Sequence, residues 1–296
     1  ARMSVNNVLI NRMRTALHMK NRMHHGSGVK LDQKEITITF DHVSFSYPNQ
    51  DRNILDDVSF TLHAGQKLAL VGANGAGKST IVKLILGFYT PSAGSIYING
   101  TDICELDLDD LYTHITGIFQ DAVMLSYSIA ENVSMQDITD TDLQRVKDCL
   151  KRSGLWEFIF ALPQQELTHI GKDIEEDGIQ LSGGQKQKLF MARALYRDFG
   201  CLLLDEPTAA LDALAEKALY ESYHELTQGT SSLFISHRLS STRFCDEILV
   251  LDQGHIVERG SHEELLGKQG IYAAMFQAQS QYYEEEGDEC ECMAGN

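Results

Sequence analysis

The sequence feature that most constrains the fold is the stretch GANGAGKS, from Gly72 to Ser79. It follows a short apolar run, Lys67 to Val71, and precedes a helical pattern that ends before Gly87. A glycine-rich turn between a buried strand and a helix offers backbone N–H groups to an anion, and the helix N-terminus favours negative charge. The stretch therefore predicts a phosphate-binding loop in an α/β domain. An ordinary glycine-rich turn is the alternative, and the flanking strand and helix patterns disfavour it.

The residues of this loop have distinct expected roles in binding ATP and Mg²⁺. Lys78 would hold the β- and γ-phosphates, and Ser79 would place its hydroxyl on the metal ion. The expected cofactor-binding residues of the loop are Gly72, Asn74, Gly75, Ala76, Gly77, Lys78, Ser79 and Thr80.

Two acidic residues follow a second apolar run. Cys201 to Leu204 leads directly into Asp205 and Glu206. In parallel α/β sheets, side chains at the carboxyl ends of strands face the ligand crevice. We expect Asp205 to bind Mg²⁺ through water and Glu206 to act as the general base on an attacking water. A helix-capping acid before Pro207 is the alternative, which the nearby phosphate-binding loop disfavours.

The remaining patterns predict what surrounds this site. Alternating apolar residues at 36–40 and 43–47, with a run at 58–62, indicate an antiparallel β layer. Residues 126–195 have mainly helical patterns and would form a helical insert. Further strands are expected at 67–71, 95–98, 115–119, 201–204, 232–235 and 248–251, with a helix at 212–227. Strand–helix–strand order with buried apolar strands indicates a parallel α/β core.

A third element is the stretch LSGGQ, from Leu181 to Gln185, which precedes a helical pattern. A serine and two glycines at a helix N-terminus form a second anion-binding turn, although the residues alone do not say which phosphate it binds. Together with the phosphate-binding loop and the acidic pair, this stretch resembles the nucleotide-binding domain of ABC-type ATPases. The resemblance extends from about Glu35 to Gln277.

The resemblance implies a fold and further site residues. The fold is that of a P-loop NTPase, with a RecA-like parallel sheet core, an antiparallel β subdomain and a helical subdomain. By position in the family's order, Tyr47 would stack on adenine, Gln120 would contact Mg²⁺ and the attacking water, and His237 would lie at the γ-phosphate. The expected catalytic residues are Lys78, Gln120, Glu206 and His237, and the expected metal ligands are Ser79, Gln120 and Asp205.

In this family the LSGGQ stretch of one domain closes over the ATP bound to another. The resemblance therefore implies a head-to-tail dimer with a second ABC ATPase domain, as either a homodimer or a heterodimer. Asp212 would run along the interface between the two copies. The residues expected to reach the partner's nucleotide are Ser182, Gly183, Gly184 and Gln185.

Within the family, the chain resembles the exporter type. This implies ATP hydrolysis coupled to transport, a transmembrane domain in the same or a separate chain, and a location at the cytoplasmic face of the cell membrane. The segments that resemble exporters are 43–48, 128–132, 176–178, 236–240 and 254–265. The residues that depart from the usual exporter pattern, none of them a catalytic group, are Asn74, Ala76, Lys186 and Lys188.

The charge of the chain is strongly negative and unevenly distributed. Lys and Arg total 25 against 42 Asp and Glu, which gives a net charge of −17. Residues 1–34 carry seven basic residues and one acidic residue, while residues 282–296 carry six acidic residues and no basic one. The two ends cancel, so the middle of the chain holds the whole excess. Such a body disfavours binding to nucleic-acid backbones, and no nucleic-acid partner is expected.

Three regions are expected along the chain. They are a basic segment at 1–34, an ATPase domain at 35–277 with a helical insert at about 121–195, and an acidic disordered tail at 278–296. Residues 5–22 fit an amphipathic helix, which either leaves a membrane domain or packs on its own domain. No apolar run is long enough to span a bilayer, and the chain starts without Met, so we expect a processed chain, an excised domain or a fragment. The six cysteines form no CxxC pair, which favours a reducing compartment.

Two other function classes compete with the exporter hypothesis. A soluble ABC-type ATPase acting on ribosomes or DNA would carry two nucleotide domains or a very long coiled coil. Only one such domain is visible, and Leu181 lies 103 positions after Lys78. A regulatory protein that binds ATP without hydrolysing it is disfavoured by the presence of Glu206 and His237.

Overall fold

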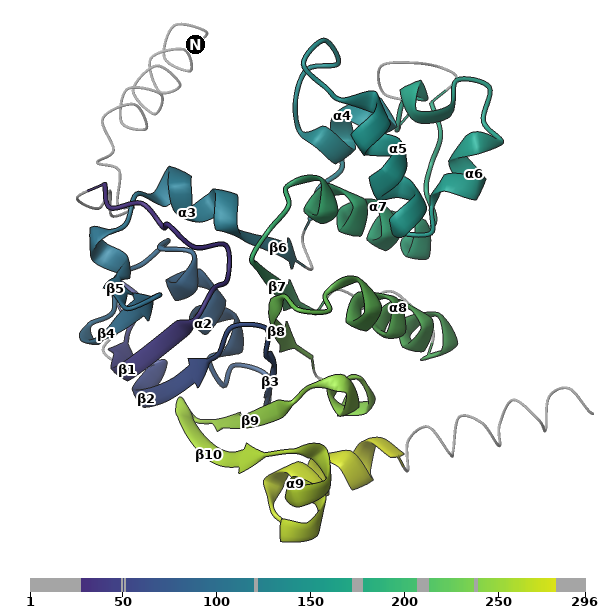
Figure 1. The fold of residues 1–296 in the computed structure, drawn as a ribbon. Coiled ribbons are helices and arrows are strands. Elements are labelled where there is room, and N and C mark those ends of the chain that lie inside the picture. Colours follow the sequence, from purple (N-terminus) through teal and green to yellow (C-terminus); the bar gives the residue numbers. More distant parts are fainter. Residues whose placement is uncertain are drawn as a thin grey trace, which may run out of the picture.

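The computed structural model describes residues 28–48, 50, 52–119, 122–171, 178–206, 213–236 and 239–280, without the side chains of 213–217, 240 and 241. Gln120, Asp212, His237, most of the basic segment and most of the acidic tail lie outside the described residues. The described residues form two β-sheets with helices around them (Figure 1).

A six-stranded sheet forms the centre of the molecule. Its strands lie in the order β10-β9-β3-β8-β7-β6, and β10 pairs antiparallel with β9 while the other pairs are parallel. The sequence predicts the five parallel strands because they carry apolar runs. It does not predict β10, an edge strand whose residues are all exposed or half-buried and therefore form no apolar run. The strands are β3 (Lys67–Val71), β6 (Ile115–Phe119), β7 (Cys201–Asp205), β8 (Ser231–Ile235), β9 (Glu247–Asp252) and β10 (His255–Gly260).

The expected antiparallel layer is a four-stranded sheet in the order β2-β1-β4-β5. The prediction of strands at 36–40 and 43–47 is corrected, because a single strand, Ile38–Phe45, spans part of each segment and leaves out 36–37 and 46–47. The register of this strand shifts between Phe40 and Val43, and His42 has a φ of 50°. A β-bulge of this kind interrupts the alternation of side chains without ending the strand. The strands are β1 (Ile38–Phe45), β2 (Leu55–Leu62), β4 (Ala93–Ile98) and β5 (Thr101–Asp102).

Helices pack against both sheets. Figure 1 shows α4, α5 and α6 together at one end of the molecule, beyond α7. The α-helices are α2 (Lys78–Ile85), α3 (Leu108–His114), α4 (Ile129–Ser134), α5 (Leu143–Arg152), α6 (Trp156–Phe160), α7 (Gly183–Tyr196), α8 (Ala213–Leu226) and α9 (His262–Lys268). Residues 271–280 are also helical, so the prediction that disorder begins at 278 is wrong for 278–280. Short 3₁₀ segments are η1 (Ile103–Glu105), η2 (Gln165–Leu167) and η3 (Leu239–Phe244). Within the described ranges, no helix has the length and apolar character that crossing a bilayer requires.

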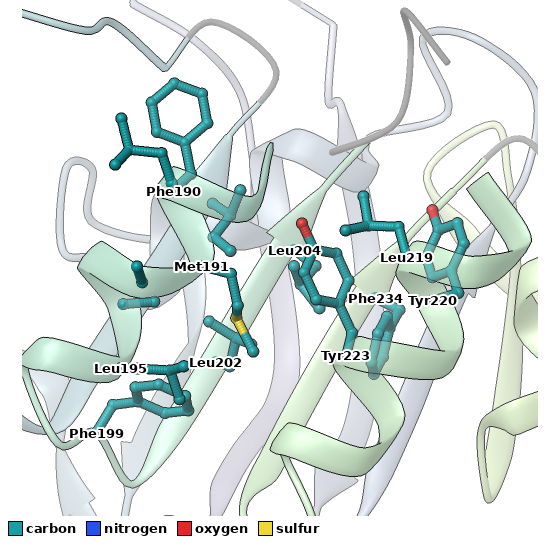
Figure 2. Close-up of a cluster of buried hydrophobic side chains, with 14 of the residues drawn as sticks. Phe190, Met191, Leu195, Phe199, Leu202, Leu204, Leu219, Tyr220, Tyr223 and Phe234 are labelled. Carbon is teal, nitrogen blue, oxygen red and sulfur yellow. The ribbon is translucent and has the colours of Figure 1, made fainter. Parts of the chain in front are cut away.

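The core has two halves, one on each face of the six-stranded sheet. Successive strand residues point to opposite faces. In β3, Leu68 and Leu70 join the half formed with α2 and the antiparallel sheet, while Ala69 and Val71 join the half formed with α7 and α8. Figure 2 shows this second half, in which the labelled side chains of α7 and α8 lie against Leu202, Leu204 and Phe234 of the sheet. Packed side chains thus cover both faces of the six-stranded sheet. A ligand site is therefore expected at the carboxyl ends of its parallel strands.

Candidate active site

The glycine-rich loop joins the end of β3 to the start of α2, as its sequence predicts. Gly77 is the N-cap of α2 and has a φ of 110°, a conformation that side chains rarely adopt. A Cβ at Gly77 would also lie 2.6 Å from Cδ2 of Leu55. At Gly72, a Cβ would collide with the carbonyl oxygen of Leu251. The loop can therefore pass this close to its neighbours only with glycine at these two positions.

Lys78 is buried within the loop, with 5 % of its surface exposed. Its Nζ donates hydrogen bonds to the carbonyl oxygens of Gly72 at 2.8 Å and Ala73 at 3.0 Å. Burial lowers the pKa of the ammonium, and the nearby carboxylates of Glu206 and Asp205 oppose this shift. An ammonium group has three N–H donors, so Lys78 can bind a phosphate oxygen while both carbonyl bonds persist.

A hydroxyl and two carboxylates meet at the carboxyl end of β7. Ser79 Oγ donates to Asp205 Oδ1 at 3.3 Å, which joins the first turn of α2 to the last residue of β7. Glu206 follows with a φ of 49°, and its N–H donates to the carbonyl oxygen of Ile235 at 3.0 Å. Hydroxyl and carboxylate oxygens are the donors that Mg²⁺ prefers, so Ser79 and Asp205 fit a magnesium site.

Lys78, Ser79 and Glu206 share one pocket of about 550 Å³, and Asp205 is joined to it through its hydrogen bond with Ser79. A volume of this order is usual for a small-molecule or cofactor site. The sequence prediction misses Ile54, which precedes β2 and carries no motif that would single it out. The residues lining the pocket are Tyr47, Ile54, Asn74, Gly75, Gly77, Lys78, Ser79, Thr80 and Glu206.

Tyr47 lies at the edge of this pocket, within an aromatic cluster that the sequence does not predict. Its ring makes edge contacts with Phe45 and Tyr89, with centroids 5.1 and 5.3 Å apart. Its hydroxyl lies 3.1 Å from Thr80 Oγ1, and Lys83 Nζ lies 5.6 Å from the ring centroid. The expected adenine platform is thus held against α2, beside the phosphate-binding loop.

The LSGGQ stretch begins α7 and closes its first turn. Ser182 Oγ accepts the N–H of Gln185 at 3.3 Å, and Gln185 Oε1 accepts the N–H of Ser182 at 2.9 Å. This reciprocal pair is a capping box. Ser182, Gly184 and Gln185 line a second hollow of about 420 Å³, which shares no lining residue with the pocket at Lys78. Gly183 starts the helix and is exposed. Within the described chain, the two predicted anion-binding turns are therefore apart.

Three expected site residues, Gln120, Asp212 and His237, lie outside the described residues. Their sequence neighbours are informative nonetheless. Gln120 follows the last residue of β6 and His237 follows the residue after β8, and both strands end on the same side of the sheet as β7.

An apolar groove of about 300 Å³ lies between β6 and α7. Arg193 of α7 lines this groove, and its Nε donates a hydrogen bond to the carbonyl oxygen of Asn132 at 2.8 Å. A second guanidinium nitrogen donates to the carbonyl oxygen of Val123 at 3.3 Å. Arg193 therefore ties α7 both to α4 and to the chain just after Gln120. Sequence reasoning misses this residue, because its partners lie about sixty residues away and no local pattern marks it.

Comparison with protein families gives one family that matches this arrangement. The model described as ABC transporter matches residues 55–209, which include the glycine-rich loop, the LSGGQ stretch and the acidic pair.

Curated relatives and a solved structure agree with that match. The ATP-dependent lipid A-core flippase of Burkholderia pseudomallei (strain 1710b) is 42% identical over 258 residues, covering 86% of this chain and 42% of the relative. The protein of the same name from Saccharophagus degradans is 42% identical over 250 residues, covering 84% of this chain and 42% of the relative. A bacterial Atm1-family ABC exporter with ATP bound aligns with a TM-score of 0.80 and 35% identity, over 92% of this chain and 46% of that one. The chain thus spans less than half the length of these proteins.

Proposed function

The chain belongs to the ABC transporter family, and we propose that it hydrolyses ATP to drive the export of a substrate across a membrane. It has the P-loop NTPase fold of the nucleotide-binding domains in that family. The observation that carries the proposal is the single pocket in which Lys78, Ser79 and Glu206 meet, with Asp205 bonded to Ser79. A positive donor, a metal-binding pair and an adjacent carboxylate are the groups that phosphoryl transfer to water requires.

Each side chain has one role in the proposed reaction. Lys78 binds the terminal phosphate oxygens, and Ser79 and Asp205 hold Mg²⁺, which neutralises phosphate charge when bound. Glu206 accepts the proton of the attacking water. From the family resemblance, Gln120 orients that water and His237 contacts the γ-phosphate. Tyr47 positions the adenine, since it lines the same pocket.

We further propose that a second ABC ATPase domain completes the site. The separation of the two anion-binding turns within one chain supports this, because Ser182 and Gly183 are exposed and available to a neighbour. In the head-to-tail arrangement, Ser182, Gly183, Gly184 and Gln185 of one copy contact the ATP held by the other, and Asp212 lies along the interface. ATP then adds contacts to the dimer that ADP lacks, so hydrolysis reopens it.

We propose a transmembrane domain as the second partner. It belongs to the same or a separate chain, and the ATPase domain contacts it at the cytoplasmic face of the membrane. Exposed apolar side chains around the groove at Arg193 support this docking, since apolar patches mark interaction sites. Phe88, Val123 and Met135 are 41%, 69% and 43% exposed. Arg193 would connect movement there to α7, which begins with the LSGGQ stretch.

The test of this function is turnover of Mg-ATP by the purified chain and by its Glu206→Gln variant. We expect Glu206→Gln to lower kcat at least a hundredfold while ATP still binds, because loss of a positioned general base costs about that factor. The variant should also accumulate an ATP-bound dimer in size-exclusion chromatography. Turnover by Glu206→Gln at the rate of the unchanged chain would show that the general-base assignment is wrong.

A further inference from the structure

The helix formed by residues 271–280 packs against η3, the short segment that follows His237 in the sequence. Tyr272 and Gln279 are seven residues apart, which is close to two helical turns, so they share one face of this helix. Tyr272 is fully buried and Gln279 is half-buried. Both side chains make hydrogen bonds to η3, so this face is the contact between the two segments.

Gln279 binds the first residue of η3. Its Oε1 accepts the backbone N–H of Leu239 at 2.9 Å. The first N–H groups of a helical segment have no acceptor within that segment, and burying one without a partner is costly. Leu239 is fully buried, so the Gln279 side chain supplies an acceptor that the local sequence does not.

A second chain of hydrogen bonds reaches the same residue from Tyr272. A guanidinium only donates, so Arg243 Nε donates to His262 Nε2 at 3.3 Å. The neutral ring then donates from Nδ1 to the Tyr272 hydroxyl at 2.7 Å. Tyr272 in turn donates to Thr242 Oγ1 at 2.9 Å, and Thr242 donates to the carbonyl oxygen of Leu239 at 2.8 Å. Each donor in this chain has one acceptor, so its direction is fixed.

The helix therefore holds both backbone groups of Leu239. Gln279 binds the N–H directly, and Tyr272 binds the C=O through Thr242. On the other side of His237 and Arg238 in the sequence, Ser236 directly follows β8. It is buried, and its Oγ lies 3.5 Å from the Tyr220 hydroxyl. His237 and Arg238 are thus the only residues in sequence between two buried, hydrogen-bonded points.

We propose that Gln279 is a positioning residue for ATP hydrolysis, which sets the location of His237 by fixing Leu239. The inference rests on the proposed function, in which His237 acts at the γ-phosphate. A short connection between two fixed points limits where its side chains can reach. Releasing one of those points should misplace His237 while the phosphate-binding loop, which lies on another element, is unchanged.

A purely structural role for Gln279 predicts a different result. It would lower the free energy of unfolding and the fraction of folded protein, but folded molecules would keep their turnover rate. Positioning instead lowers kcat per folded molecule and leaves KM for Mg-ATP unchanged, because the residues proposed to bind ATP belong to other elements than this helix. The two roles are therefore separated by kcat and KM measured at a temperature where every variant is folded.

The experiment uses the full chain with three variants. Gln279→Leu removes the acceptor at similar size, and Gln279→Glu keeps an acceptor oxygen. Gln277→Leu is the matched control, since Gln277 is an exposed glutamine on the same helix. We expect Gln279→Leu to lower kcat about tenfold with KM within about twofold, the size expected for one lost hydrogen bond. Gln279→Glu and Gln277→Leu should keep kcat within about threefold of the unchanged chain, because neither removes the acceptor of the Leu239 N–H.

Hydrogen exchange of the Leu239 amide gives a readout that does not depend on hydrolysis. Exchange should be faster in Gln279→Leu and unchanged in Gln277→Leu. A wild-type kcat in Gln279→Leu, or an equal fall in Gln277→Leu, would overturn the positioning role, as would unchanged exchange at Leu239. If the unchanged chain hydrolyses no ATP, the proposed function fails instead, and exchange at Leu239 still decides whether Gln279 holds this segment.

Discussion

A buried lysine in a chain of net charge −17 needs local groups that keep it charged and in place. Burial lowers the pKa of Lys78, while two backbone carbonyls accept its N–H groups and the carboxylates of Asp205 and Glu206 favour the charged form. The result is a positive charge held by the loop itself. It faces a pocket in an otherwise acidic body, which gives a phosphate group one strongly preferred location.

Removing this ammonium should mainly weaken nucleotide binding. Hydrogen bonds to charged groups contribute about 1.5–3 kcal/mol, so we expect Lys78→Ala to weaken Mg-ATP binding roughly tenfold to a hundredfold. Isothermal titration calorimetry measures this change. Lys151→Ala is the control, because Lys151 is an exposed lysine of α5 and is paired with Asp148. Equal affinities of Lys78→Ala and the unchanged chain would contradict the role of Lys78.

His262 of α9 contacts the helix at 271–280 through its hydrogen bond to Tyr272. Burial lowers its pKa, the Arg243 charge lowers it further, and Glu263 opposes both. The neutral ring is the form that accepts from Arg243 and donates to Tyr272. Below its ordinary value of about 6.5, the unfolded chain therefore binds a proton that the folded chain resists. The stabilisation by His262 is complete above that pH and is lost as the pH falls below it.

This pH dependence can be isolated with His262→Gln. The free energy of unfolding of the unchanged chain should fall between pH 7 and pH 5 more steeply than that of the variant, because only His262 differs between the two. Urea denaturation at several pH values measures both slopes. A steeper loss of stability in His262→Gln over this range would show that the sign of the pKa shift is wrong.

At the scale of elements, Asn132 determines how the chain after β6 enters the helical group. It is fully buried in α4, and its amide binds both the N–H and the C=O of Leu125 at 2.9 Å. The same side chain donates to the carbonyl oxygen of Ser128 at 3.0 Å. One amide therefore satisfies the backbone of the turn between the segment after Gln120 and the start of α4.

Asn132→Ala should remove the three hydrogen bonds that this amide makes to the backbone of Leu125 and Ser128. Each hydrogen bond contributes about 0.5–1.5 kcal/mol net, so we expect the loss of three to lower the free energy of unfolding by about 2–4 kcal/mol. Asn53→Ala is the control, since Asn53 is exposed and its amide bonds only to Asp56, at 3.3 Å, within the described contacts. Chemical denaturation of both variants measures the difference. A loss no larger in Asn132→Ala than in Asn53→Ala would show that the turn does not depend on this amide.

The elements differ in how far the sequence predicts them, for physical reasons. The strands β3, β7 and β8 are predictable because burial on both faces leaves a continuous apolar run. The strand β10 is not, since it is half-exposed at an edge. The loop from Gly72 to Ser79 is predictable because its residues are contiguous in the sequence and lead from a strand into a helix. The contact of Gln279 with Leu239 spans forty residues, and no local pattern records it.

At the scale of the whole molecule, the net charge of −17 acts against the proposed dimer. Two copies with the same excess of negative charge repel each other, and bound ATP adds negative charge to the interface. Attraction must therefore come from short-range contacts, including those of the LSGGQ stretch with the partner's ATP. Long-range repulsion is screened by salt over about 10 Å at 0.1 M, whereas close contacts at a dehydrated interface are screened much less.

The ATP-dependent dimer should consequently become tighter as the salt concentration rises. In the Glu206→Gln background, which prevents turnover, we expect the dimer dissociation constant with Mg-ATP to fall several-fold between about 0.05 and 0.5 M NaCl. Analytical ultracentrifugation measures this constant, and the same series with ADP controls for salt effects that do not involve ATP. A dissociation constant that rises with salt would mean that complementary charges at the interface outweigh the net repulsion. In that case the net negative charge of the chain would not limit dimer formation. Arg152 and Lys188, which line the hollow at the LSGGQ stretch, would then be the next residues to substitute.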